Sequence, residues 1–164
     1  MHRLVITFMA ALLVMGWLFT ATPAWAQSEL EGVWEQIEVS GHNEEGDWER
    51  DNIQPGLMIF HDGYFSRTVV TGNEARPLMD EDETLATLAD EKLRAIVLPF
   101  GGQAGTYEIS GSTLTRTVVA AKNPNIMQGD PLQNMTFSMD GDVLTIRADL
   151  GDGYWREEKW RRLR

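Results

Sequence analysis

Three arginines stand in the middle of short segments in which apolar and polar residues alternate: Arg67, Arg116 and Arg147. A guanidinium that faces the inside of a fold can hold a carboxylate or an enolate through two parallel hydrogen bonds. Arginine is rarely buried without a partner, so the solvent side of each segment is the first expectation for these residues. The alternative is that one of Arg67, Arg116 and Arg147 points inward and anchors the acidic group of a small molecule.

Other residues would complete such a cavity. Tyr64, Tyr107 and Tyr154 would supply hydroxyl groups at its mouth. In segment 135–139, Met, Phe and Met alternate with Thr and Ser, so the three apolar side chains share one face, which we expect to point inward. Methionine suits an adaptable pocket and an ordinary core equally well, and both interpretations stay open. The predicted cavity residues are Tyr64, Arg67, Tyr107, Arg116, Met135, Phe137 and Met139.

Residues for other kinds of chemistry are sparse. Beyond the first few positions the histidines are His42 and His61, and the chain has no cysteine. The sequence contains neither His-x-His nor His-Glu-x-x-His, the spacings expected of a zinc or copper site, and neither histidine is well placed as a haem ligand. No serine lies in a nucleophile motif. We therefore predict no metal ion, no cofactor and no catalytic set.

Two aromatic motifs lie at opposite ends of the fold-forming sequence, Gly32-Val33-Trp34 and Trp160-Arg161-Arg162. If the first and last strands pair, Arg162 would lie over the indole of Trp34. Such a cation–π contact contributes roughly 0.5–2 kcal/mol. We assign Gly32, Trp34, Trp160 and Arg162 to closure of one end of the fold, with the alternative that Trp34 lines a ligand cavity.

The elements that must position these residues are short strands separated by Gly, Asp and Asn. Asp62-Gly63 lies between two apolar runs, which is a strong signal for a tight hairpin turn. A polar loop is predicted at 40–52 and a turn-rich loop at 122–131. Strands are predicted at 30–39, 57–60, 64–70, 106–110, 113–121, 135–139, 143–150 and 154–163.

One segment has a different period. From Leu85 to Ile96 the apolar residues recur at helical spacing, and Asp80 with Glu83 forms a plausible capping pair, so we predict a helix over 80–96. Pro99 would end it. The helix would lie over the mouth of the fold as a lid or pack on its outside. The fold class is therefore all-β and mainly antiparallel: an up-and-down barrel, which leaves no exposed edge strands, with one inserted helix.

Several short motifs follow one another along the chain. They are Leu30-x-Gly32-x-Trp34, Pro55-Gly56-Leu57, Asp62-Gly63-Tyr64, Gly105-Thr106-Tyr107-Glu108-Ile109, Asn123-Pro124 with Gly129, Gly141-Asp142-x-Leu144 and Trp160-x-Arg162. In this order they resemble the bacterial lipocalin-like domain family. The resemblance implies an up-and-down barrel with a central cavity, and it implies cyclisation or isomerisation as an alternative activity. Leu114-Thr115-Arg116-Thr117 and Gln133-Asn134 depart from the histidine and arginine that relatives often carry there.

The N-terminal segment predicts export. Arg3, the apolar run from Leu4 to Phe19 and Ala24-Trp25-Ala26 are typical of a cleavable signal peptide over residues 1–26. Residues 27–164 would form a single barrel domain, periplasmic or secreted, with no membrane anchor after cleavage. The formal net charge is −11, which repels phosphate backbones and argues against nucleic acid as a partner.

Together these features predict an exported lipocalin-like barrel that binds a small hydrophobic or amphipathic molecule. Two alternatives stay open. An isomerase or cyclase would show an inward ionisable pair within hydrogen-bond reach. An envelope protein-interaction or stress factor would show a filled barrel and an exposed apolar patch near the 122–133 loop.

Overall fold

The computed structural model describes residues 29–128 and 132–164. The predicted signal peptide, 1–26, and part of the loop at 122–131 lie outside the described residues. The elements are β1 (Gly32–Asn43), β2 (Gly46–Glu49), β3 (Gly56–His61), β4 (Tyr64–Val70), α2 (Asp90–Val97), β5 (Phe100–Ser110), β6 (Thr113–Ala121), the 3-10 helix η1 (Pro124–Met127), β7 (Leu132–Asp140), β8 (Val143–Gly151) and β9 (Tyr154–Arg162). Among these residues, no helix is both long and apolar enough to cross a bilayer.

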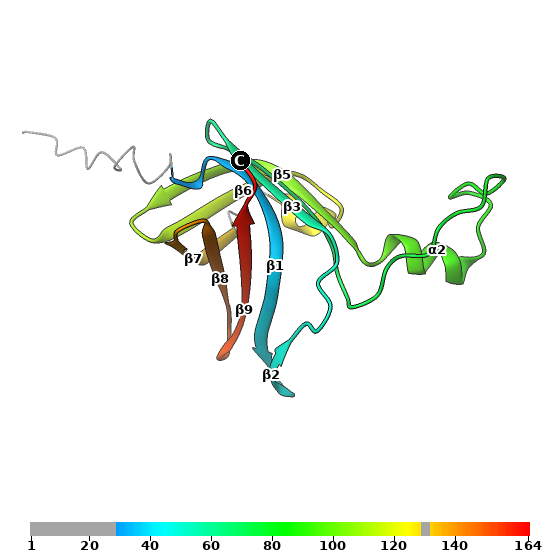
Figure 1. The fold of residues 1–164 in the computed structure, drawn as a ribbon, viewed down its shortest axis with the longest axis horizontal. Coiled ribbons are helices and arrows are strands. Elements are labelled where there is room, and N and C mark those ends of the chain that lie inside the picture. Colours follow the sequence, from blue (N-terminus) through cyan, green and yellow to red (C-terminus); the bar gives the residue numbers. More distant parts are fainter. Residues whose placement is uncertain (1–28, 129–131) are drawn as a thin grey trace, which may run out of the picture.

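The strands form one antiparallel sheet that closes on itself (Figure 1). The order is β2-β1-β3-β4-β5-β6-β7-β8-β9, and β1 also pairs with β9, so the eight strands other than β2 make a closed ring. In the β1–β9 ladder Trp34 lies opposite Arg162, with a bulge between Gln36 and Glu38. The predicted up-and-down barrel is confirmed.

The connections divide the barrel into two ends. The connections at 62–63, 111–112 and 141–142 are tight turns at the end where β1 begins and β9 finishes, which we name the closed end. The connection at 71–99 and the one that begins at Lys122 are long and start at the opposite end, which we name the open end. Asp62 and Gly63 both have positive φ, of 48° and 76°, as the tight hairpin turn requires.

The predicted loop at 40–52 is wrong, because its first half continues β1 and pairs with β2. His42 Nδ1 lies 2.8 Å from Asp47 Oδ1 across this hairpin. Gly41 allows the close approach: a Cβ there would lie 2.5 Å from the ring of Trp48. The hairpin is mostly polar because it extends β1 beyond the pairing with β3, so the sequence lacks the alternation of a half-buried strand.

The helix predicted over 80–96 is shorter and begins later, as α2 from Asp90 to Val97. Asp80 and Glu83 do pair: the Asp80 amide donates to Glu83 Oε2 at 2.8 Å and the Glu83 amide to Asp80 O at 3.0 Å. This exchange makes a turn, not a helix start. None of the residues in α2 is buried, and in Figure 1 the helix stands away from the barrel. Without packing on its apolar side a short helix has little to extend it.

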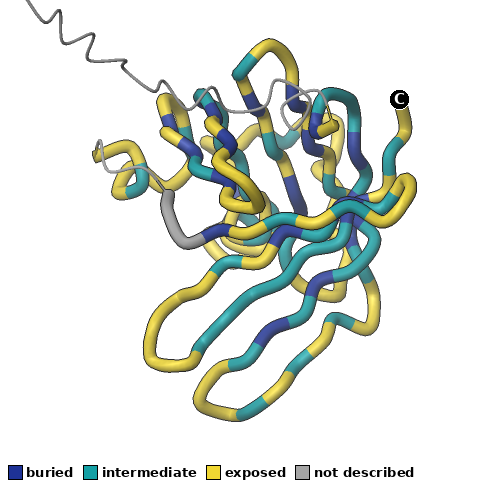
Figure 2. Tube along the Cα trace, turned by 90° about the vertical axis from the view of Figure 1, so that its left-hand side faces the viewer, coloured by how far each residue is buried: buried dark blue, intermediate teal, exposed yellow. Residues whose placement is uncertain are grey.

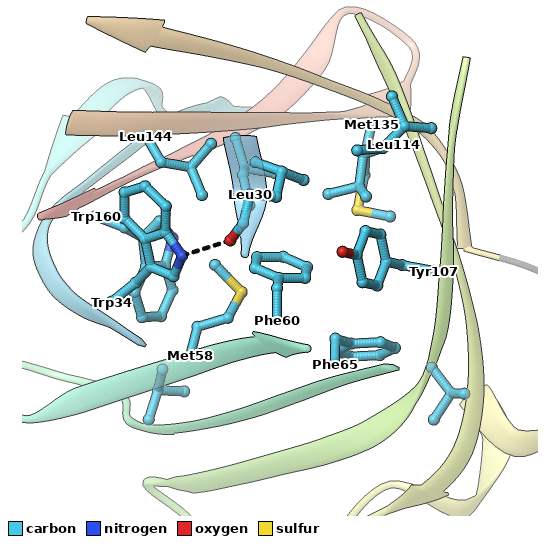
Figure 3. Close-up of a cluster of buried hydrophobic side chains, with 14 residues drawn as sticks. Leu30, Trp34, Met58, Phe60, Phe65, Tyr107, Leu114, Met135, Leu144 and Trp160 are labelled. Carbon is cyan, nitrogen blue, oxygen red and sulfur yellow. Dashed lines mark hydrogen bonds between the residues drawn. The ribbon is translucent and has the colours of Figure 1, made fainter. Parts of the chain in front are cut away.

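Buried residues recur along the barrel strands (Figure 2), and their side chains form one core cluster that includes Trp34, Phe60, Tyr107 and Trp160 (Figure 3). Phe60 and Tyr107 meet edge to face with ring centres 4.9 Å apart. Fully burying one such large apolar side chain contributes about 1.5–3 kcal/mol. The buried apolar side chains with essentially no exposure are Leu30, Trp34, Val39, Met58, Phe60, Leu114, Leu144 and Trp160.

Candidate functional site

The closed end is plugged by the two aromatic motifs. Trp34 donates from Nε1 to Leu30 O at 2.9 Å, the dashed line in Figure 3. The guanidinium carbon of Arg162 lies 4.1 Å from the centre of the Trp34 ring, and its two terminal nitrogens donate to Glu31 O and Glu29 O, each at 2.6 Å. A Cβ at Gly32 would lie 2.3 Å from Arg164 O, so glycine lets the chain end pack here. These contacts leave no passage for a ligand past Trp34.

Arg67 points into the barrel, not toward solvent. Its Nε donates to Glu158 Oε2 at 3.2 Å and its Nη2 to Glu158 Oε1 at 2.5 Å, a two-pronged ion pair. The Arg67 and Glu158 side chains are only 11% and 12% exposed. Arg67 also lies 5.7 Å from the centre of the Trp160 ring. The expectation that Arg67 faces outward is therefore wrong, because Glu158 supplies the partner that burial requires.

Several guanidiniums share this one carboxylate. Arg156 Nη2 lies 2.6 Å from Glu158 Oε1, the oxygen that Arg67 also contacts. Burial alone would raise the pKa of Glu158, but the charges of Arg67 and Arg156 hold it below its usual range. Burial and the charge of Arg156 lower the pKa of Arg50, so Arg50 belongs to the same group. We name Arg50, Arg67, Arg116, Arg156 and Glu158 the arginine cluster.

Arg116 is the most buried member of the arginine cluster, at 8% exposed. Its guanidinium carbon lies 5.1 Å from the centre of the Phe65 ring, and Nη2 donates to Met135 Sδ at 3.0 Å. Its Nε has no hydrogen-bond partner among the described residues. Burial, followed by the charge of Arg67, lowers the pKa of Arg116 to about 10. Among the described residues Arg116 is thus a buried cation that forms no ion pair with a carboxylate.

Three further polar side chains have buried atoms without a hydrogen bond among the described residues: Gln36, Trp160 and Arg156, whose Nη2 nevertheless lies within ion-pair distance of Glu158. Gln36 is 4% exposed, and neither its Oε1 nor its Nε2 makes a hydrogen bond to the described part of the chain. The same holds for Nε1 of Trp160, which lies opposite Gln36 in the β1–β9 ladder. Leaving one buried polar group unpaired costs about 1–3 kcal/mol, so these groups need a physical reason.

The open end leads to one member of the arginine cluster, Arg67. A cavity of about 290 Å³ lies there, where η1 and the beginning of β5 meet. Asn123 starts η1 by accepting from the Asn125 amide at 3.1 Å, and Lys122 Nζ donates to Leu98 O at 2.8 Å, which ties this rim to the end of α2. The residues that line the cavity are Arg67, Gly101, Gly102, Gln103, Lys122, Asn123 and Ile126.

The other predicted cavity residues lie in three places. Tyr64 is 64% exposed, and its prediction is wrong: it is the first residue of β4 and takes the face opposite Phe65. Tyr107 and Met135 are buried in the core, where Tyr107 Oη lies 3.4 Å from Glu31 Oε1. Phe137 and Met139 are partly buried against the same core. The prediction therefore combined core residues with two members of the arginine cluster.

Arg147 lies on the outer face, as first expected. Its guanidinium carbon is 4.0 Å from the centre of the Trp155 ring, and its side chain is 45% exposed. A larger cavity, of about 600 Å³, also lies outside the barrel, between the outer face of β4–β6 and the segment that carries α2. This placement puts the end of α2 against the outside of the barrel and not across the open end.

Sequence reasoning missed Arg50, Arg156, Glu158 and Gln36. One available signal was the period of two along β9: stepping back from Trp160 places Glu158 and Arg156 on the same face. Within residues 29–128 and 132–164, no three His, Cys, Asp or Glu side chains gather as a metal site would require.

Known proteins offer limited comparisons. No protein-family model matches the chain, and no curated protein matches it. Among solved structures, the chain is similar to a lipocalin-like protein from Bacteroides uniformis, with 13% identity over 82% of this chain and 99% of that one and a TM-score of 0.43. It is also similar to a redesigned beta barrel, with 16% identity over 85% of this chain and 96% of that one and a TM-score of 0.41. The description of this chain as a barrel rests on its own strand order and on the pairing of β1 with β9.

Proposed function

We propose that this chain is an exported, lipocalin-like protein that binds a small hydrophobic or amphipathic molecule inside its barrel. The observation that carries the proposal is the cavity at the open end, which reaches the inward side chain of Arg67. The opposite end is occupied by Trp34 and Arg162, so a ligand has one way in. Closed barrels of this size hold their own side chains or one small ligand.

The unpaired polar groups inside the barrel support binding. Gln36, Trp160 and Arg116 each keep at least one buried nitrogen without a partner in the described residues. A core selected for stability alone would replace such groups with apolar side chains. A ligand with oxygen atoms would supply the missing hydrogen bonds.

Export is proposed from the sequence of residues 1–26. The protein would act in the periplasm or outside the cell, without a cofactor and without nucleic acid as a partner. Mass determination of the protein purified from its host's envelope tests this. A chain that begins at Gln27 supports export, and an intact N-terminus on an intracellular protein contradicts it.

Native mass spectrometry tests the binding proposal. The protein purified gently from its host should carry a discrete extra mass that leaves on denaturation. Ile126→Trp should remove that mass, because Ile126 lines the cavity at the open end. Ile59→Trp is the matched control, since Ile59 lies on the outer face of β3 and its side chain is exposed. A wild-type protein that stays bare after incubation with a lipid and metabolite extract contradicts the proposal.

An isomerase or cyclase is the second candidate, and one observation favours it. Arg67 and Glu158 form an inward ionisable pair within hydrogen-bond reach. The low pKa of Glu158 makes it a weak proton acceptor, however, and its oxygens are already engaged by Arg67 and Arg156, so binding ranks first. Recovery of the bound molecule before and after prolonged incubation separates the two: a changed structure of the molecule supports catalysis.

Of the two features expected for a protein-interaction role, the structure has exposed apolar side chains near the 122–133 loop but not a filled barrel. Val119 and Met127 are exposed beside the 122–133 loop. The barrel nevertheless has a cavity at its open end, whereas that role predicted a filled barrel.

A further inference from the structure

We propose that the arginine cluster is an anion-binding site that takes the carboxylate of a small organic acid, with Arg116 as its anchor. This inference rests on the proposed function, because it names the chemical class of the molecule that enters by the open end.

The first argument is the local excess of positive charge. The whole chain has 25 acidic and 14 basic residues, yet Arg67 and Arg116 point into the barrel near the carboxylate of Glu158. The partly exposed Arg156 and Arg50 lie near the same carboxylate. Burying a charge without a partner is costly, and a buried ion pair is often no more stabilising than apolar side chains of the same volume. A purely structural role leaves the surplus of arginine unexplained, whereas an incoming anion would balance it.

The second argument is that the arginine cluster already binds a carboxylate of its own. Arg67 holds both oxygens of Glu158 in the two-pronged arrangement that guanidinium and carboxylate prefer, and Arg156 approaches the same oxygen at 2.6 Å. The contacts of Glu158 therefore show that the guanidiniums of Arg67 and Arg156 bind a carboxylate. It also saturates Arg67, so a second carboxylate must find other donors.

Arg116 is the most buried arginine that offers such donors, although Nε of Arg156 also has no partner among the described residues. The Nε of Arg116 has no partner in the described part of the chain, and its Nη2 has only the thioether sulfur of Met135, a weak acceptor. A carboxylate would replace that contact with charge-assisted hydrogen bonds. The ring of Phe65 and the side chain of Met135 beside the guanidinium would contact the apolar part of the same acid. Lys122 and Arg67, which line the cavity at the open end, place positive charge along the way in.

The test compares one acid with its neutral analogue in matched variants. Isothermal calorimetry with octanoate, octanol and octyl phosphate would be run on the full mature protein and on Arg116→Met and Arg147→Met. Both arginines lie over an aromatic ring, but Arg147 is on the outer face. We expect Arg116→Met to weaken octanoate binding by at least about ten-fold, the effect of losing one charge-assisted pair, and to leave octanol binding unchanged. Arg147→Met should change neither.

Each other result has a defined meaning. Equal octanoate affinity in wild type and Arg116→Met overturns the anion site but leaves the proposed function standing. Failure of wild type to bind either octanoate or octanol contradicts the proposed function as well. Tighter binding of octyl phosphate than of octanoate overturns the assignment to a carboxylate.

A measurement on wild type alone covers the case in which Arg116→Met does not fold. The carbon-13 signal of carboxyl-labelled octanoate reports its ionisation in the complex. Guanidinium partners favour the ionised form, so the bound acid should stay ionised to lower pH than free octanoate. A bound acid that titrates like the free one, or at higher pH, contradicts the inference.

Discussion

At the closed end of the barrel Trp34 and Trp160 are fully buried, and Arg162 lies on an indole with its terminal nitrogens donating to backbone carbonyls. At the open end Arg116 lies on an aromatic ring as well, but its Nη2 donates to a thioether sulfur and its Nε has no partner in the described part of the chain. The same type of residue on the same type of ring thus has two environments. Where the backbone satisfies the cation, the contact stabilises the fold; where it does not, the contact is available to a ligand.

The largest expected effect on stability comes from a substitution that opens a cavity at the closed end. Trp34→Ala should lower the free energy of unfolding by about 3–5 kcal/mol, because it leaves a large cavity in a core with no exposure and removes the ring under Arg162. Denaturant titration measures it. Unchanged stability together with altered ligand selectivity would mean that Trp34 is part of the ligand site and that the division into two ends is wrong.

The next effect is loss of the carboxylate at the open end. Glu158→Gln should cost about 3 kcal/mol, since it leaves the nearly buried Arg67 without the charge that compensates it and removes the partner of the partly exposed Arg156. Glu157→Gln is the matched control, because Glu157 lies opposite the outward Arg147. An equal loss of stability in both variants would contradict the claim that the inward position of Glu158 makes it more important for stability than Glu157.

The same residue gives the protein a pH dependence. The pKa of Glu158 is lower in the folded than in the unfolded state, so its stabilising contribution is complete above its ordinary value of 4.5 and is lost as the pH falls through the folded pKa. Wild type should therefore lose stability below about pH 4.5 more steeply than Glu158→Gln. Urea unfolding at several pH values measures both slopes, and parallel curves would refute the assignment.

The smallest effect sharpens the comparison between arginines. Arg162→Leu should cost about 1–2 kcal/mol, because it removes the contact with Trp34 and the hydrogen bonds to Glu29 O and Glu31 O. Arg147→Leu should change stability by no more than about 0.5 kcal/mol, since Arg147 is half exposed. Thermal unfolding of the two variants measures both losses of stability. A larger loss in Arg147→Leu than in Arg162→Leu would contradict the prediction.

The features of the fold that were predicted correctly depend on residues that are close together in the sequence. Asp62-Gly63 needs only its own two residues to accept positive φ, and the turn formed where it was expected. The strand at 113–121 has the predicted bounds because its alternation matches a half-buried strand. The helix at 80–96 failed because a periodic pattern does not show whether a packing partner exists.

The site was harder to predict because it depends on pairing between distant segments. Arg67 is 91 positions before its partner Glu158. The residues next to Arg67 in the sequence therefore give no sign that a carboxylate allows it to be buried. The bulge between Gln36 and Glu38 also shifts the alternation of β1, which hides the inward position of Val39 after it. Composition alone therefore favoured the outer face for arginines that closure of the barrel turns inward.

The most direct test of this account observes the arginine side chains at both ends while the ligand is added. In a nitrogen-15 NMR titration with octanoate, the Nε–H signal of Arg116 should shift in a saturable way, whereas that of Arg162 should stay in place. Equal shifts at both ends, or a shift of Arg162 with Arg116 unchanged, would contradict the claim that the open end binds the ligand and the closed end only holds the fold.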